Sequence, residues 1–107
     1  MAVFGVRIAC YEHGITMITL NFNCQRSGSN NDNCEMRIVR RAAGFGDYIL
    51  PGTPDFTMFS DKTAAAWTFV DPDVPATGAF DYIVQVKKKD GNGIFYDMYL
   101  SAIHSKR

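Results

Sequence analysis

The stretch Trp67-Thr-Phe-Val-Asp71-Pro72 is followed by a loop rich in proline and glycine, and then by Phe80-Asp-Tyr-Ile-Val-Gln-Val86. The second run alternates apolar and polar residues, and a period of two is typical of a β-strand with one buried face. The chain next passes Asp90-Gly91 and Asn92-Gly93, which are favoured in hairpin turns, and returns as Ile94-Phe-Tyr-Asp-Met-Tyr-Leu100. The sequence therefore predicts a strand, a long corner and a terminal β-hairpin against which the rest of the chain packs.

The same period of two recurs upstream, in residues 3–11, 15–25 and 35–41. Shorter extended runs occur near residues 48–50 and 55–60. Residues 61–66 have helical propensity but allow one turn at most, and the adjacent strand could equally absorb them. This rhythm predicts an all-β fold, an antiparallel β-sandwich or jelly roll of about 7–10 strands. With 107 residues, we expect a single domain spanning residues 1–107.

Composition excludes several classes of protein. Hydrophobic residues make up 47% of the chain and the formal net charge is zero, which is typical of a folded protein and not of a disordered one. Zero net charge provides no general attraction to nucleic acid or to an anionic membrane. No apolar run approaches the ~20 residues of a membrane helix. The N-terminus lacks the pattern of a signal peptide. We expect a cytoplasmic or virion-associated protein.

The three cysteines do not form a recognisable metal or disulfide pattern. Cys10, Cys24 and Cys34 are odd in number and include no C-x-x-C pair, which argues against a structural zinc site. Cys10 falls in an apolar strand pattern and is expected to be buried. Cys24 and Cys34 flank a polar loop and could face each other across a hairpin, so a bond between them stays open.

Catalytic groups do not converge in the sequence. His13 sits in an expected turn and His104 near the end of the sequence, and nothing in their spacing indicates a catalytic site or an H-x-H or H-x-x-x-H metal pair. A phosphate-binding loop is also missing. We therefore expect no enzyme activity, no cofactor and no metal. The alternative is a small enzyme that uses His13 or His104 as a general base. Asp71 and Asp73 could suggest a calcium loop, but a corner fixed by Pro72 explains them more simply.

Two polar loops are the candidate ligand-binding segments. The first contributes Arg26, Asn30 and Asp32, and the second contributes Asp71 and Asp73. Aromatic faces can stack on sugar rings. The candidates for that role are Trp67, Tyr48, Tyr96 and Tyr99.

The last strand is apolar on both of its faces. Phe95, Tyr99 and Ile103 lie opposite a stripe that is already apolar. A two-layer sandwich buries only one face of each strand, so the second face needs a partner. We therefore predict that Phe95, Tyr99 and Ile103 contact a neighbouring subunit.

The terminal unit resembles the end of small jelly-roll domains found in phage and phage-derived proteins. There, a W-x-F-x-D strand is followed by a Pro/Thr/Gly corner, a Y-x-[VL]-x-[VA]-[KR] strand and a last strand that often ends in Lys-Arg. The matching residues here are Trp67, Phe69, Asp71, Pro72, Ala76-Thr77-Gly78, Tyr82, Val84, Val86-Lys87 and Lys106-Arg107. Tyr96-Asp97 replaces an Asn-Arg pair, and His104 replaces an acidic residue. The resemblance covers about 40 residues; the remainder matches in strand rhythm only.

This resemblance implies a TNF-like or C1q-like jelly roll that forms homotrimers around a three-fold axis. Such modules serve in phage as tail-fibre or spike heads, decorations or host-binding tips, and they carry no catalytic residues. We therefore expect a non-enzymatic, virion-associated module for structure or host-surface recognition. Its expected partners are further copies of itself, a virion protein or a cell-surface glycan, but not nucleic acid or membrane. The alternative is a carbohydrate-binding β-sandwich.

Overall fold

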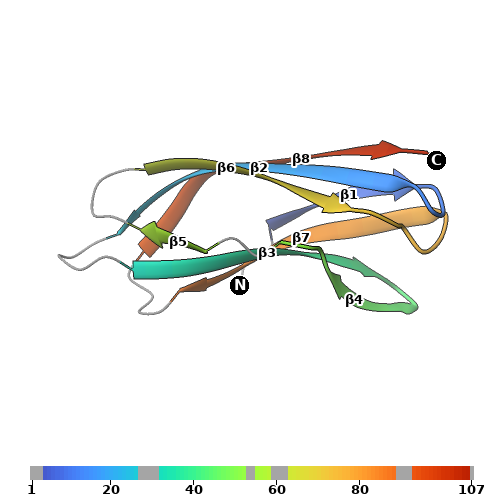
Figure 1. Ribbon diagram of the computed structural model, residues 1–107, viewed down its shortest axis with the longest axis horizontal. Helices are drawn as coiled ribbons and strands as arrows, with labels where there is room; N and C mark the ends of the chain where they lie inside the picture. Colours follow the sequence, from blue (N-terminus) through green and yellow to red (C-terminus); the bar gives the residue numbers. More distant parts are fainter. Residues whose placement is uncertain (1–3, 27–31, 53–54, 59–62, 89–92, 107) are drawn as a thin grey trace.

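The computed structural model describes residues 4–26, 32–52, 55–58, 63–88 and 93–106, and every regular element in these ranges is a β-strand (Figure 1). The strands are β1 (Phe4–Cys10), β2 (Ile15–Arg26), β3 (Asp32–Ala42), β4 (Phe45–Ile49), β5 (Asp55–Met58), β6 (Thr63–Asp71), β7 (Gly78–Lys88) and β8 (Gly93–Ser105). No helix long and apolar enough to cross a membrane occurs in the described part of the chain.

The strands form two antiparallel sheets. One sheet has the order β1-β7-β3-β4, with β5 also paired to β3, and the other has the order β6-β2-β8. Figure 1 shows the two sheets as stacked layers, with β6, β2 and β8 uppermost. The predicted all-β antiparallel sandwich is therefore confirmed.

Strand pairing is nested about the middle of the chain. β3 pairs with β4 and β5, β2 pairs with β6, and β1 pairs with β7. Successive pairs in this series alternate between the two sheets, as in a jelly roll, where a long antiparallel ribbon is folded over into two layers. β8 does not belong to this series of nested pairs; it pairs with β2 at the edge of the smaller sheet.

The predicted terminal hairpin is wrong. β7 pairs with β1 and β3, whereas β8 pairs with β2, so the two last strands belong to different layers. Of the two turn dipeptides on which the prediction rested, Asp90-Gly91 and Asn92 lie outside the described residues, and Gly93 is the first residue of β8. Local turn residues favour a reversal of the chain, but they do not determine which sheet the next strand joins.

The hairpin assumed between Cys24 and Cys34 is absent for the same reason, because β2 and β3 lie in different sheets. Cys24 is a free, buried thiol, and burial raises its pKa. Cys10 is also buried and free, as expected. The side chain of Cys34 lies outside the described part.

The possible helical turn before Trp67 is also excluded where the structure describes it. Residues 63–66 form the first half of β6 and pair with residues 21–24 of β2. Six residues are too few to hold an isolated helix, whereas the strand gains a full antiparallel ladder. The short extended run predicted near residues 48–50 overlaps β4, which begins earlier and spans Phe45–Ile49.

The core lies between the two sheets and has two connected parts. One part contains Cys10, Ile18, Ile38, Leu50, Phe69, Val74, Phe80 and Tyr82, and the other contains Leu20, Phe22, Cys24 and Met36. Trp67, Val84 and Leu100 pack against both parts. Each large apolar side chain buried here contributes about 1.5–3 kcal/mol to folding. Two faces are left outside this core, one on each sheet.

Candidate functional site

The outer face of the larger sheet carries paired charges beside an apolar row, Ile83–Val39–Ile49, in which Ile49 is 46% exposed. Arg7 on β1 contacts Asp81 on β7 at 2.8 Å, and Arg41 on β3 contacts Asp47 on β4 at 2.8 Å. The hydrogen bond from Arg7 holds the pKa of Asp81 below its ordinary value, and the hydrogen bond from Arg41 does the same for the pKa of Asp47. Both ion pairs are solvent-exposed, and exposed ion pairs of this type are typical of a surface in contact with water.

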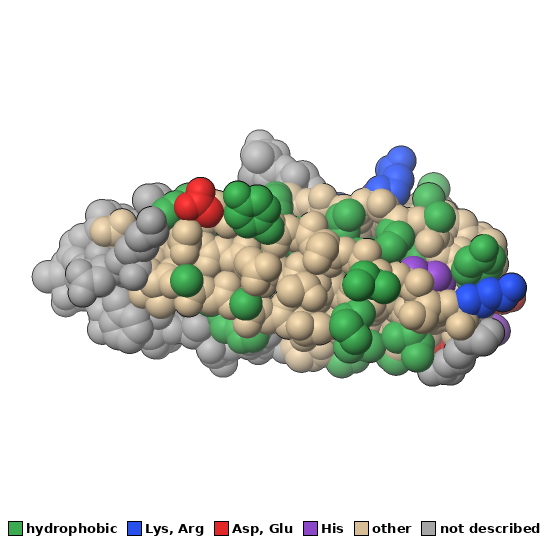
Figure 2. Space-filling view, turned by 90° about the horizontal axis from the view of Figure 1, so that it is seen from above, with side chains coloured by type: hydrophobic (Ala, Val, Ile, Leu, Met, Phe, Trp, Pro, Cys, Tyr) green, Lys and Arg blue, Asp and Glu red, His purple; other side chains and the backbone are tan. Residues whose placement is uncertain are grey.

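The outer face of β6, β2 and β8 differs sharply in composition. Cross-strand rows, ordered from β6 through β2 to β8, are Val70–Met17–Ile103, Thr68–Thr19–Ser101 and Ala66–Asn21–Tyr99. Among the described side chains on this face, Asp97 is the only charged one. Figure 2 looks onto this side of the molecule, where uncharged and hydrophobic atoms cover most of the surface. We call this surface the uncharged face.

A β-bulge interrupts β8 on this face. Asn21 pairs with Tyr99 and Asn23 pairs with Tyr96, so Asp97 and Met98 lie together opposite Phe22. Asp97 has a φ of 51°, in the left-handed region that few residues other than glycine adopt. Aspartate tolerates this conformation better than most residues do. The extra residue reverses the side-chain alternation on the N-terminal side of the bulge.

This reversal corrects one of the predicted interface residues. Phe95 pairs with the buried Cys24, packs against the core and lies 5.4 Å from the ring of Phe22, so it faces inward. The prediction that it shares a face with Tyr99 is wrong, because strict alternation was assumed across the bulge. Tyr99 and Ile103 do share the outer face, and they are 69% and 68% exposed.

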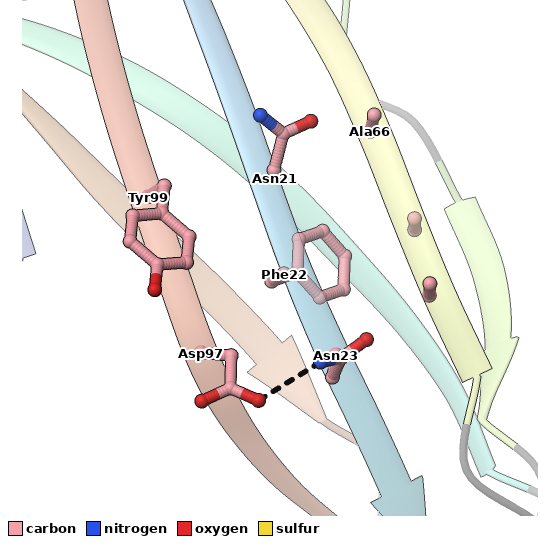
Figure 3. Close-up of a pocket in the computed structure, with 8 residues that line it drawn as sticks. Asn21, Phe22, Asn23, Ala66, Asp97 and Tyr99 are labelled. Carbon is pink, nitrogen blue, oxygen red and sulfur yellow. Dashed lines mark hydrogen bonds between the residues drawn. The ribbon is translucent and has the colours of Figure 1, made fainter.

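The uncharged face is hollowed at one end. A shallow, open depression of about 620 Å³ is lined by Asn21, Phe22, Asn23, Ala64, Ala65, Ala66, Asp97 and Tyr99. The small alanine side chains of β6 leave the space, and Tyr99 and Asp97 of β8 border its other side (Figure 3). Asn23 Nδ2 donates a hydrogen bond of 3.0 Å to Asp97 Oδ2. The depression therefore combines one exposed aromatic ring with amides and a carboxylate.

Asp71, one of the predicted ligand-loop residues, is not available to a ligand. It ends β6 facing inward and is fully buried. Arg40 Nη1 donates to both of its carboxylate oxygens at 2.8 Å, and the Tyr82 hydroxyl donates to Oδ2 at 2.7 Å. Burial is the main reason that the pKa of Tyr82 is raised. The prediction placed Asp71 in a loop because Pro72 follows it, but β6 continues through Asp71.

The other predicted ligand-loop residues are not brought together. Asp73 is exposed, and its Oδ1 lies 2.9 Å from His13 Nδ1. Arg26 and Asp32 are strand ends whose side chains lie outside the described part, and Asn30 lies outside it altogether. A calcium loop finds no support, since no group of three or more His, Cys, Asp or Glu side chains suited to a metal occurs among the described residues.

His104 is part of the internal polar framework. Its Nε2 accepts a hydrogen bond of 2.8 Å from the backbone N–H of Tyr11, so the proton of the neutral ring is on Nδ1. Nδ1 lies 2.8 Å from the buried Thr16 hydroxyl and donates to it. Both ring nitrogens are thus engaged within the protein, which leaves neither of them directed at a substrate.

The aromatic candidates for stacking also separate. Trp67 packs inward, 5.5 Å from the ring of Phe22, and is excluded as a surface platform. The Arg40 guanidinium lies over the ring of Tyr48 at 4.5 Å. Tyr96 is half-buried, whereas Tyr99 is exposed beside the depression. The sequence did not predict the bulge that places Asp97 beside the depression. Its one signal in the sequence was an acidic residue within a mainly apolar strand.

Comparison with protein-family models, with curated proteins and with solved structures found no match. The structure itself shows a β-sandwich with paired charges on one outer face and an uncharged outer face on the other sheet.

Proposed function

We propose that the protein is a non-enzymatic module that assembles with copies of itself through the uncharged face and serves structure or host-surface recognition. The observation that carries this proposal is the contrast between the two outer faces. Depletion of charge, together with exposed Tyr and Met, is typical of the centre of a protein interface. The paired charges of the opposite sheet are typical of a surface that stays in water.

The row Val70–Met17–Ile103 is the proposed centre of the subunit contact. Its members are 39%, 48% and 68% exposed, and they lie side by side across three strands. A contiguous apolar row gains free energy when a partner removes it from water, by about 25 cal/mol for each Å². No charged residue among the described side chains of this row opposes the approach of a second copy.

The number of copies and the biological setting rest on the resemblance of residues 67–107 to phage jelly-roll domains. That resemblance favours a homotrimer in a virion-associated protein. The nested strand pairing of the sandwich supports a jelly roll in general terms. Formation of a trimer would also compensate for the modest core of a short chain.

Size measurement in solution with a matched pair of variants tests this function. Ile103→Asp places a charge in the apolar row and is expected to dissociate the assembly to monomers, because an unpaired carboxylate is costly to bury. Ala9→Asp places the same charge on the exposed outer side of β1, in the other sheet, and is expected to leave the assembly intact. A monomeric wild-type protein, or equal effects of the two variants, would refute the proposed contact.

A carbohydrate-binding β-sandwich that acts as a monomer or dimer is the second candidate. The depression favours it, because Tyr99 lies there beside Asn21, Asn23 and Asp97. Loss of glycan binding in Tyr99→Ala in a protein that is monomeric at all concentrations would favour this alternative over the trimeric module.

A further inference from the structure

Tyr99 gives the depression an apolar platform. Its side chain is 69% exposed on β8, an edge strand, and it is opposed by Asn21 and Ala66 across the sheet. A tyrosine so exposed adds little to the core. The face of its ring can instead cover the apolar face of another ring, and its hydroxyl can still reach a polar partner.

Polar side chains line the depression beside this platform. Asn21 and Asn23 project from β2 on the same side as Tyr99, and Asp97 projects from β8 (Figure 3). An amide offers two donors and an acceptor, and a carboxylate oxygen accepts more than one hydrogen bond. The bond from Asn23 to Asp97 holds both side chains in fixed orientation. Donors and acceptors in close alternation match the hydroxyl groups of a sugar.

The conformation of Asp97 is an independent indication of a site. Its positive φ is uncommon for a residue other than glycine, although aspartate tolerates it, and it occupies a bulge that breaks an otherwise regular ladder between β2 and β8. Bulges are over-represented next to sites where a side chain is re-aimed for binding. Here the bulge directs the carboxylate to the rim of the depression.

The charge of the lining selects among ligands. Among the described lining residues, Asp97 is charged and none is cationic. A carboxylate with no cation among the described lining residues repels a phosphate, a sulfate or an acidic sugar. The depression is also shallow and open rather than closed around a single small molecule. These features suit an uncharged, extended ligand.

From these observations we infer that the depression is a binding site for a neutral oligosaccharide, in which Tyr99 stacks on a sugar ring and Asn21, Asn23 and Asp97 bond its hydroxyls. The inference rests on the recognition role proposed above and gives that role a ligand class and a place. Asn21 lies four residues along β2 from Met17, the centre of the apolar row, which is about 13 Å at ~3.3 Å per residue. A subunit contact at the apolar row and a ligand in the depression therefore occupy different ends of the face.

Titration of the full-length chain with neutral hexasaccharides of glucose, mannose and xylose, each followed by NMR chemical shifts, tests this site. We expect shifts at Tyr99 and Asn21 with at least one of them, and none with a sulfated hexasaccharide. Tyr99→Ala and Asp97→Gly are each expected to weaken binding by about tenfold or more, which corresponds to ~1.4 kcal/mol. Asp97→Gly is the sharper variant, because glycine accepts the positive φ and the fold is retained or stabilised while the carboxylate is lost.

Ser101→Ala, on the same face of β8 but outside the lining, is the matched control and is expected to bind as the wild type does. Ile103→Asp tests the site independently of the proposed assembly. If this variant is monomeric and still binds the neutral hexasaccharide with the affinity of the wild type, the result would support the site. The site is refuted if no neutral hexasaccharide shifts Tyr99 or Asn21 at millimolar concentration. It is equally refuted if binding survives Asp97→Gly and Tyr99→Ala undiminished, or if only the sulfated sugar binds.

Discussion

Replacement of Arg40 by methionine tests the account of the sandwich interior most severely. Arg40 is the cation that neutralises Asp71, a carboxylate with no solvent exposure, and its own side chain is only 11% exposed. Methionine keeps much of the side-chain volume but removes the charge and the donors. Asp71 would retain the Tyr82 hydroxyl and lose both bonds from Arg40 Nη1.

The expected cost follows from leaving a buried charge without its partner. Such a change typically destabilises a protein by about 3–5 kcal/mol. Domains of this size are stable by roughly 5–15 kcal/mol, so Arg40→Met removes a large share of the total. The loss has two sources, the unpaired carboxylate and the two broken charge-assisted hydrogen bonds.

Urea unfolding followed by the fluorescence of Trp67, the only tryptophan of the chain, measures this loss at a fixed protein concentration. Arg41→Met is the control, since Arg41 is a neighbour on the same strand whose pair with Asp47 is exposed, and we expect a much smaller effect. The double variant Arg40→Met/Asp71→Asn should be more stable than Arg40→Met alone, because it removes the buried charge. A loss below about 1 kcal/mol for Arg40→Met, or no recovery in the double variant, would refute this reasoning.

Two further predictions concern the larger sheet. Because Arg7 lowers the pKa of Asp81, this pair stabilises the fold above the ordinary aspartate pKa of about 3.9, and the stabilisation is lost as the pH falls through the lower folded value. Arg7→Gln should raise the pKa of Asp81 towards its ordinary value in an NMR titration; an unchanged value would contradict this cause. Gly5→Ala should destabilise the fold by about 1–3 kcal/mol, because its Cβ would lie 2.7 Å from the Tyr82 carbonyl oxygen. Gly46→Ala, which meets no atom within 4 Å, should change stability far less in the same urea experiment.

Much of the fold could be predicted from the sequence because strands leave a local signature. The period of two located β2, β3, β7 and β8, and it sorted most of their residues correctly into inner and outer faces. The partners of each strand could not be predicted in the same way. The ladder between β2 and β8 joins residues some 70 to 90 positions apart, and nothing in the local turn residues encodes that choice.

The candidate site was less predictable than the fold for two physical reasons. A single inserted residue in a ladder inverts the faces of everything beyond it, so the bulge at Asp97 moved Phe95 into the core. Polar residues near a corner can be either solvated or buried with partners, and Asp71 is buried because Arg40 and Tyr82 reach it from the opposite sheet. Tyr99 and Ile103, which lie on the C-terminal side of the bulge, were placed correctly on the outer face.

The central claim is that the uncharged face is covered by other copies of the chain. Sedimentation velocity of the wild-type protein over a range of micromolar concentrations tests it most directly. We expect a particle of three times the 11.9 kDa chain mass, which Ile103→Asp reduces to a single chain. A wild-type protein that sediments as one chain at every concentration would contradict it.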